Sequence, residues 1–131
     1  MKIVADTNLL LRAAIEDDPR QAELAQAELR NAQTVAIGIS ALCEFALVLT
    51  QRYKIPEADI ADAIRTFIAA KNVIVDRVAV EAGLIILDSG GDFADGVIAH
   101  EGRLLGGETF VSFDKQAVRL LKAAGENARQ L

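Results

Sequence analysis

Cysteine, histidine and tryptophan are scarce in this sequence, which has one cysteine, one histidine and no tryptophan among 131 residues. A single cysteine excludes an intrachain disulfide framework, and Cys43 lies in an apolar run where a small core residue is expected. The single histidine, His100, is expected at the surface or against a partner rather than in catalysis. No secretory signal is recognisable, so we expect a cytoplasmic protein.

A hydrophobic run long enough to cross a membrane is also missing. The best candidate is TVAIGISALCEFALVLTQ, residues 34–51, which has about the length of a short transmembrane helix. Gly38 and Ser40 divide it into a strand and a helix that Ser40 caps, and Glu44 lies in its middle. The sequence therefore predicts no membrane contact.

Positive charge is in deficit, because the net charge is -5 and the isoelectric point is about 4.8. Proteins that bind nucleic acids usually carry a basic surface. The acidic charge balance therefore argues against binding of a nucleic acid such as RNA, unless bound divalent ions offset part of the negative charge. Apolar residues are abundant at 52%, whereas about 45–50% is ordinary even with glycine counted. We expect a single domain over residues 1–131, with part of its apolar surface covered by a partner.

Short segments rich in Val, Ile or Thr predict strands at residues 2–6, 34–38, 73–75 and 109–112. Apolar residues spaced by three and four predict helices over 19–32, 40–53, 56–71, 76–87, 93–105 and 114–125. Strands that alternate with helices are typical of an α/β fold with a parallel sheet and helices on both faces. The tail GENARQL shows no clear strand, so the sheet is expected to have four or five strands.

Acidic residues stand at the ends of strands and the beginnings of helices. Asp6 ends the first strand in KIVADTNLLLR, Asp114 follows the last strand in TFVSFD, and Asp92 and Asp95 open a helix. Each position suits a helix N-cap or the first helical turn, where a carboxylate is favourable. The alternative is a functional site, because carboxylates at the carboxyl ends of parallel strands line the crevice where α/β folds bind ligands.

Glu44 is harder to explain by capping, because it lies one turn into a helix among apolar neighbours. Burying it is costly unless it is paired or binds a metal; a solvent-facing Glu44 beside a broad apolar stripe is the alternative. If it converges with Asp6, Asp95 and Asp114, the carboxylates repel one another and take up protons unless a cation neutralises them. Such an all-oxygen pocket suits Mg²⁺ or Mn²⁺ and predicts phosphodiester hydrolysis.

These motifs resemble those of a PIN-domain ribonuclease of the VapC toxin type, from bacterial type II toxin–antitoxin systems. The resemblance runs in order over nearly the whole chain, through ADTN, the Glu of SALCEF, DFADGVIAH and SFD. It implies a three-layer α/β sandwich and Mg²⁺- or Mn²⁺-dependent endonucleolytic cleavage of RNA. It also implies that four acids bind the metal and act in catalysis: Asp6, Glu44, Asp95 and Asp114. The accessory polar residues that it implies are Thr7, Asn8, Asp92 and Ser112. The partners implied are an RNA substrate, a cognate antitoxin, and a second subunit in a homodimer or a toxin–antitoxin hetero-oligomer.

Two other functions remain open from the sequence. A receiver-like signalling domain is also a small α/β unit with an acidic Mg²⁺ pocket, and Asp76 could serve as its phosphoacceptor, but Glu44 would then have no role. A non-catalytic binding module of the PIN fold is the second alternative. If RNA is the substrate, five basic residues are candidates for contacts with its phosphates: Arg12, Arg52, Lys54, Arg103 and Lys115.

Overall fold

Three short parallel strands form the first sheet of the computed structural model, which describes all 131 residues. They are β1 (Lys2–Val4), β2 (Thr34–Ala36) and β3 (Val73–Ile74), in the order β1-β2-β3. In the register of the sheet, Val35 lies between Ile3 and Val73 and is completely buried. One edge of β1 is paired with β2, and no strand pairs with its other edge.

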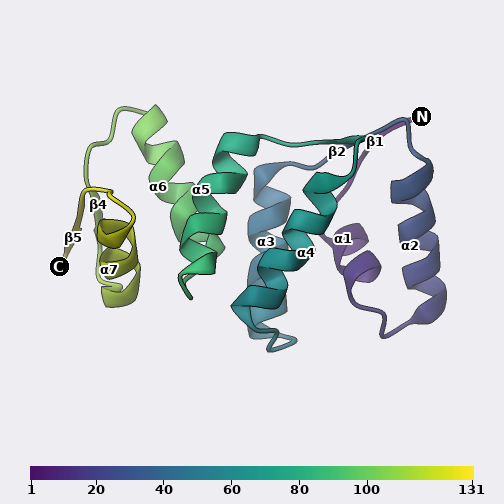
Figure 1. Cartoon of the computed structure of the whole chain (residues 1–131), viewed down its shortest axis with the longest axis horizontal. Coiled ribbons are helices and arrows are strands. Elements are labelled where there is room, and N and C mark those ends of the chain that lie inside the picture. The colour runs from purple at the N-terminus through teal and green to yellow at the C-terminus, as the bar shows by residue number, and fades with distance from the viewer.

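A second sheet is formed by β4 (Phe110–Ser112) and β5 (Ala128–Gln130), which are also parallel. The carboxyl-terminal tail GENARQL therefore contributes a strand, β5, and this answers the question that the sequence left open. The chain has five strands, as allowed by the prediction, but they form two sheets rather than the single sheet expected. Figure 1 shows β4 and β5 at one end of the long axis, with the β1 strand toward the other end.

Seven helices connect the strands; six of them agree with the six predicted helical segments to within a few residues, and α1 (Thr7–Ala14) is a helix for which no segment was predicted. Aspartates cap four of them by accepting a hydrogen bond from a backbone N–H three residues later. The predicted cap at Ser40 is wrong, because the helix already begins at Ile39, after Gly38 as N-cap residue. The helices are α1 (Thr7–Ala14), α2 (Pro19–Asn31), α3 (Ile39–Gln51), α4 (Glu57–Ala69), α5 (Arg77–Asp88), α6 (Phe93–Leu104) and α7 (Lys115–Ala123).

The main core joins the first sheet to α1 and to α3 through α6, with Phe45 and Phe93 among its completely buried side chains. Helices α5 and α6 pack closely at Gly96, where an added Cβ atom would lie 2.3 Å from the carbonyl oxygen of Ala82. Glycine is therefore required there by backbone proximity. A separate, smaller core holds α7 against α5 and α6; it consists of Ile86, Ala99, Leu120 and Leu121.

His100 is buried, with only 8% of its surface exposed, so the expectation that it lies at the surface is wrong. Residues four apart share a face of a helix, and His100 follows Gly96 by four positions. His100 therefore lies on the face of α6 that packs against α5. No helix of the structure has the length and apolar character needed to cross a membrane.

Candidate functional site

Asp6 lies at the junction of β1 and α1, where the chain must change from strand to helix. Its Oδ1 atom accepts a hydrogen bond of 2.8 Å from the backbone N–H of Leu9, so the capping role is present. Its side chain is nevertheless exposed and shares a surface pocket with Asn8 and Arg12. The cap uses one carboxylate oxygen, which leaves lone pairs of the other directed toward solvent.

Glu44 is exposed on α3, and its Oε2 atom accepts a hydrogen bond of 3.1 Å from the hydroxyl of Thr7. Of the two alternatives for Glu44, burial is therefore wrong and the solvent-facing position is the one observed. Leu42 and Phe45, which are close to Glu44 in sequence, form part of the buried face of α3 and point into the core. Glu44 lies on the opposite face of the helix. The hydrogen bond still holds the Glu44 carboxylate at Thr7, the first residue of α1. Thr7 follows Asp6 directly in the chain.

Cys43 packs half-buried against the main core, as expected for a small core residue. Burial raises the pKa of its thiol to about 11, and the negative charges of Glu101 and Asp92 add to the effect. A thiol with this pKa stays protonated at neutral pH and is a poor nucleophile. Cys43 therefore has no catalytic role in this site.

Asp92, Asp95 and Asp114 come from two segments of the chain and lie close enough for their charges to interact. Partial burial raises the pKa of Asp95 to about 6, with further contributions from the charges of Asp92 and Asp114. Loss of hydration also raises the pKa of Asp92, and the charge of Asp114 adds to it. These three carboxylates thus repel one another, and no ion pair of the chain involves any of them.

The two helix-capping positions in this group behave differently. Asp114 caps α7 through a 3.0 Å hydrogen bond from the N–H of Ala117, and the Ser112 hydroxyl accepts one of 2.9 Å from the Asp114 N–H. Asp92 occupies the N-cap position of α6, yet its side chain accepts no capping hydrogen bond. Capping therefore accounts for Asp114 but not for the acid at position 92.

The predicted acids form two groups instead of one pocket. Thr7 joins Glu44 to the beginning of α1, next to Asp6, whereas Asp92, Asp95 and Asp114 gather at the openings of α6 and α7. Nowhere in the chain do three or more His, Cys, Asp or Glu residues lie in positions that could hold a metal ion together. Asp6 follows β1 and Asp114 follows β4, and these two strands belong to different sheets.

The groove between α3 and α6 contains an acid that the sequence-based prediction missed. Glu101 and Glu44 line it from opposite helices, together with the partly exposed side chains of Leu47 and Ile98. The available signal was the spacing of Ala94, Ile98 and Glu101, which places them on one face of a helix.

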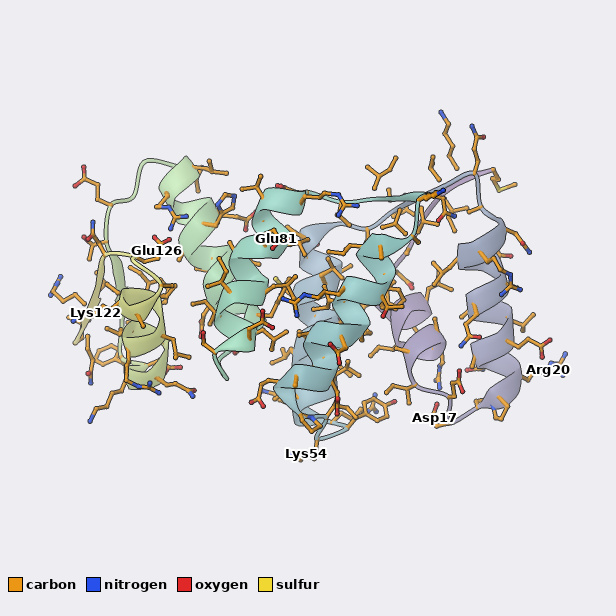
Figure 2. The ribbon with its side chains drawn as sticks, in the orientation of Figure 1. Asp17, Arg20, Lys54, Glu81, Lys122 and Glu126 are labelled. Carbon is orange, nitrogen blue, oxygen red and sulfur yellow. The ribbon has the colours of Figure 1, made fainter.

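Two of the five basic residues proposed for phosphate contacts are engaged in ion pairs. Arg12 lies 3.7 Å from Asp17, and Arg103 of α6 pairs with Glu126. Figure 2 labels Glu126 and Lys122 in the carboxyl-terminal part of the chain, at the end of the molecule that contains α7. These pairs are partly exposed, so a phosphate can compete for either arginine.

No curated protein matches this sequence. The PIN domain family matches residues 3–123, a span that includes every predicted site residue. Proteins of this family are typically nucleases, which agrees with acids gathered at helix openings and strand ends. Since the match covers nearly all of its residues, the chain belongs to the PIN domain family.

Proposed function

We propose that this protein is a Mg²⁺- or Mn²⁺-dependent endoribonuclease and the toxin of a toxin–antitoxin pair. Membership of the PIN domain family supports a nuclease, and the residues that resemble the VapC motifs support the narrower assignment. The catalytic, metal-binding acids in this proposal are Asp6, Glu44, Asp95 and Asp114, with Thr7, Asn8, Asp92 and Ser112 as accessory residues. The family match leaves the receiver-like alternative without support.

The observation that carries the proposal is the group formed by Asp92, Asp95 and Asp114. Burial and the charge of Asp114 raise the pKa of both Asp92 and Asp95, and none of the three acids has a basic partner, so the charges of Asp92 and Asp95 destabilise the folded protein. A site for a cation or for proton transfer is the usual reason for retaining such an arrangement. Asp114 caps α7, but neither a cap nor an ion pair accounts for Asp92 or Asp95.

The proposed metal ion fits the chemistry of the donors but does not fit their arrangement in this structure. Carboxylate oxygens without His or Cys are the ligand set that Mg²⁺ and Mn²⁺ prefer. The acids, however, are divided between two groups, and no three of them are placed to hold an ion together. We therefore assign no catalytic step to the metal. The roles supported here are those of Thr7, which fixes Glu44, and Ser112, which fixes the backbone at Asp114.

The proposed antitoxin would cover the groove between α3 and α6. Leu47 and Ile98 are 41% and 55% exposed there, and both are large apolar side chains. Glu44 and Glu101 lie in the same groove, so a partner that combines apolar residues with an Arg or Lys would complement both its shape and its charge. Inhibition by this partner should weaken when that basic residue is replaced by Ala.

The function is tested by incubating the purified protein with total RNA in the presence of Mg²⁺, Mn²⁺ or EDTA and mapping the new RNA ends. We expect metal-dependent cleavage, and at least about a 100-fold loss of rate for Asp6→Asn and Asp114→Asn. The matched control is Asp62→Asn, because Asp62 is an exposed acid in the middle of α4 and far from these motifs in the chain. Unchanged cleavage by Asp114→Asn would refute the site, and no cleavage under any condition would indicate a non-catalytic binding module.

A further inference from the structure

A surface pocket lies in the groove between α1 and α2, beside Asp6. The two helices pack against each other at the end of the molecule that contains the N-terminus (Figure 1). The pocket has a volume of about 440 Å³, which falls within the range of about 300–1,000 Å³ that is usual for small-molecule sites. The side chains that line it include Asp6, Asn8, Arg12, Gln21, Leu24 and Glu28.

Helical spacing directs two rows of these residues toward each other. Asn8 and Arg12 of α1 are four positions apart, and such residues share a face of a helix. On α2, the row runs from Gln21 through Leu24 to Glu28, with intervals of three and four positions, which is the pattern of a single helical face. Each helix therefore presents one of its faces to the pocket.

The arrangement of α1 and α2 is fixed by contacts outside the pocket. The amide nitrogen of Gln26 donates hydrogen bonds of 2.9 Å to the carbonyl oxygen of Ala13 and to the carboxylate of Glu16. Asp18 caps the beginning of α2 by accepting a hydrogen bond from the N–H of Gln21. The pocket is therefore formed before a ligand binds, and the ligand does not have to order it.

Two amide side chains in the pocket are free to bind a ligand. The side-chain amides of Gln26, Asn72 and Gln116 hydrogen-bond to other parts of the protein, whereas those of Asn8 and Gln21 form no hydrogen bond within the chain. Both free residues are exposed. Each amide offers an acceptor and two donors, so it can pair with a flat ligand that carries both kinds of group.

The rest of the pocket combines an apolar surface with one positive charge. Leu24 is 60% exposed, which leaves a large apolar side chain uncovered in the pocket. Arg12 is the only basic residue there, and its ion pair with Asp17 is long, at 3.7 Å, so a phosphate can take the place of Asp17. The negative charges of Asp6 and Glu28 favour a ligand with a single phosphate at Arg12 and uncharged groups elsewhere.

A nucleotide is a ligand that satisfies all of these groups. Its phosphate pairs with an arginine, a face of its base packs against an apolar side chain, and the edge of its base is read by an amide. Adenine suits the pocket best, because Asn or Gln pairs with its N6 and N7 atoms at once and its amino group also donates to a carboxylate. Uracil has no amino group to donate.

We propose that this pocket binds a nucleotide and prefers adenine over uracil. Arg12 holds the phosphate, Leu24 packs against the base, and Gln21 and Glu28 bind the edge of the base. Because the pocket includes Asp6, the bound nucleotide is the one next to the RNA bond that is cut. Only this last assignment rests on the proposed function, since the binding of a nucleotide requires no cleavage.

Binding is tested by NMR titration in EDTA, with adenosine 5′-monophosphate and uridine 5′-monophosphate as probes. We expect adenosine monophosphate to shift the side-chain amide signal of Gln21 and the backbone signals of α1 and α2. It should bind about tenfold more tightly than uridine monophosphate, because only adenine pairs with the amide through two hydrogen bonds. No shift at millimolar nucleotide, shifts confined to other helices, or equal affinity for the two nucleotides would overturn the proposal.

Two substitutions separate the base from the phosphate. Gln21→Leu should abolish the preference for adenosine monophosphate, whereas Arg12→Ala should weaken the binding of both nucleotides alike, because they share the phosphate. The matched control is Arg20→Ala, since Arg20 is an exposed residue of α2 that does not line the pocket (Figure 2). It should bind both nucleotides as the wild type does. A preference that survives Gln21→Leu would contradict the assignment of the base edge.

Cleavage of RNA connects the pocket to the proposed active site. The wild type should cut next to adenine more often than next to uracil, and Gln21→Leu should lose this selectivity through KM while kcat is retained, because Gln21 contacts no reacting group. If adenosine monophosphate binds in the pocket but no RNA is cut, the pocket stands and the proposed nuclease fails. If RNA is cut with the same base preference by the wild type and by Gln21→Leu, the pocket does not select the base and the inference fails.

Discussion

Replacement of Asp95 by asparagine should stabilise the metal-free protein at neutral pH. Asp95 lies in the first turn of α6, where its carboxylate is partly buried and faces the charges of Asp92 and Asp114. Its pKa rises from 3.8 to about 6. At pH values between these two, the folded protein therefore holds a proton on Asp95 that the unfolded chain has already lost. The free energy of unfolding therefore falls as the pH rises through this window and stays low above pH 6. The amide side chain of the variant has no charge to bury.

The size of the effect follows from the shift in pKa. A shift of about two units corresponds to about 3 kcal/mol at pH values above both pKa values, with 1.36 kcal/mol for each unit. Asp95 remains partly hydrated, so screening by solvent reduces this to about half. The charged carboxylate also interacts favourably with the N-terminus of α6 by about 0.3–1 kcal/mol, which the variant loses. We expect a net gain of about 1 kcal/mol for Asp95→Asn at pH 7.5 and almost none at pH 4.

Urea unfolding followed by circular dichroism, in EDTA, measures this difference at pH 4, 5, 6 and 7.5. The midpoint of Asp95→Asn should move above that of the wild type as the pH rises from 4 to 6 and then stay constant. Asp62→Asn, at an exposed position of α4, controls for the loss of one negative charge. An equal difference at every pH, or a variant less stable than the wild type at pH 7.5, would show that Asp95 is not destabilised by its neighbours.

Three further predictions concern packing and the thiol. Gly96→Ala should destabilise the fold by about 1–3 kcal/mol in thermal unfolding, because the methyl group meets the carbonyl oxygen of Ala82; Gly102→Ala, with open space around it, should not. Leu120→Ala should cost about 2–5 kcal/mol and speed amide hydrogen exchange in β4, α7 and β5, and unchanged exchange there would mean that α7 is held by other contacts. Cys43 should react with iodoacetamide far more slowly at pH 7.5 than a free cysteine, since its pKa is about 11; rapid alkylation would contradict its burial.

The helices and their caps could be predicted because both depend on short-range features of the sequence. Pro19 at the beginning of α2 and Asp76 before α5 are local signals, and each helix begins where they indicate. The division of the sheet could not be predicted in this way. It accompanies the packing of Leu120 in one core cluster with Ile86, a residue far away in the chain. β5 was equally hidden, because Arg129 and Gln130 on a sheet edge lack the apolar pattern of a strand.

The site was only partly visible in the sequence for a related reason. Asp6 and Asp114 stand out because strand ends are easy to recognise, and both side chains do lie at helix openings. Glu44 stood out for a reason that is wrong, since apolar neighbours in sequence lie on other faces of a helix and need not surround it in space. Its contact with Thr7 depends on the packing of α1 against α3, which no local pattern reports.

Asp92 differs from the capping aspartates of this chain in the effect of its charge on the fold. Asp18 and Asp76 each accept a backbone hydrogen bond at a helix N-cap, and this contact stabilises the fold by about 1 kcal/mol. Asp92 occupies the same position before α6, makes no such bond, and has a pKa raised by lost hydration and by Asp114. Its charge therefore destabilises the protein in a position where a cap would have stabilised it. A role in binding a cation or a partner would account for that loss, whereas helix formation would not.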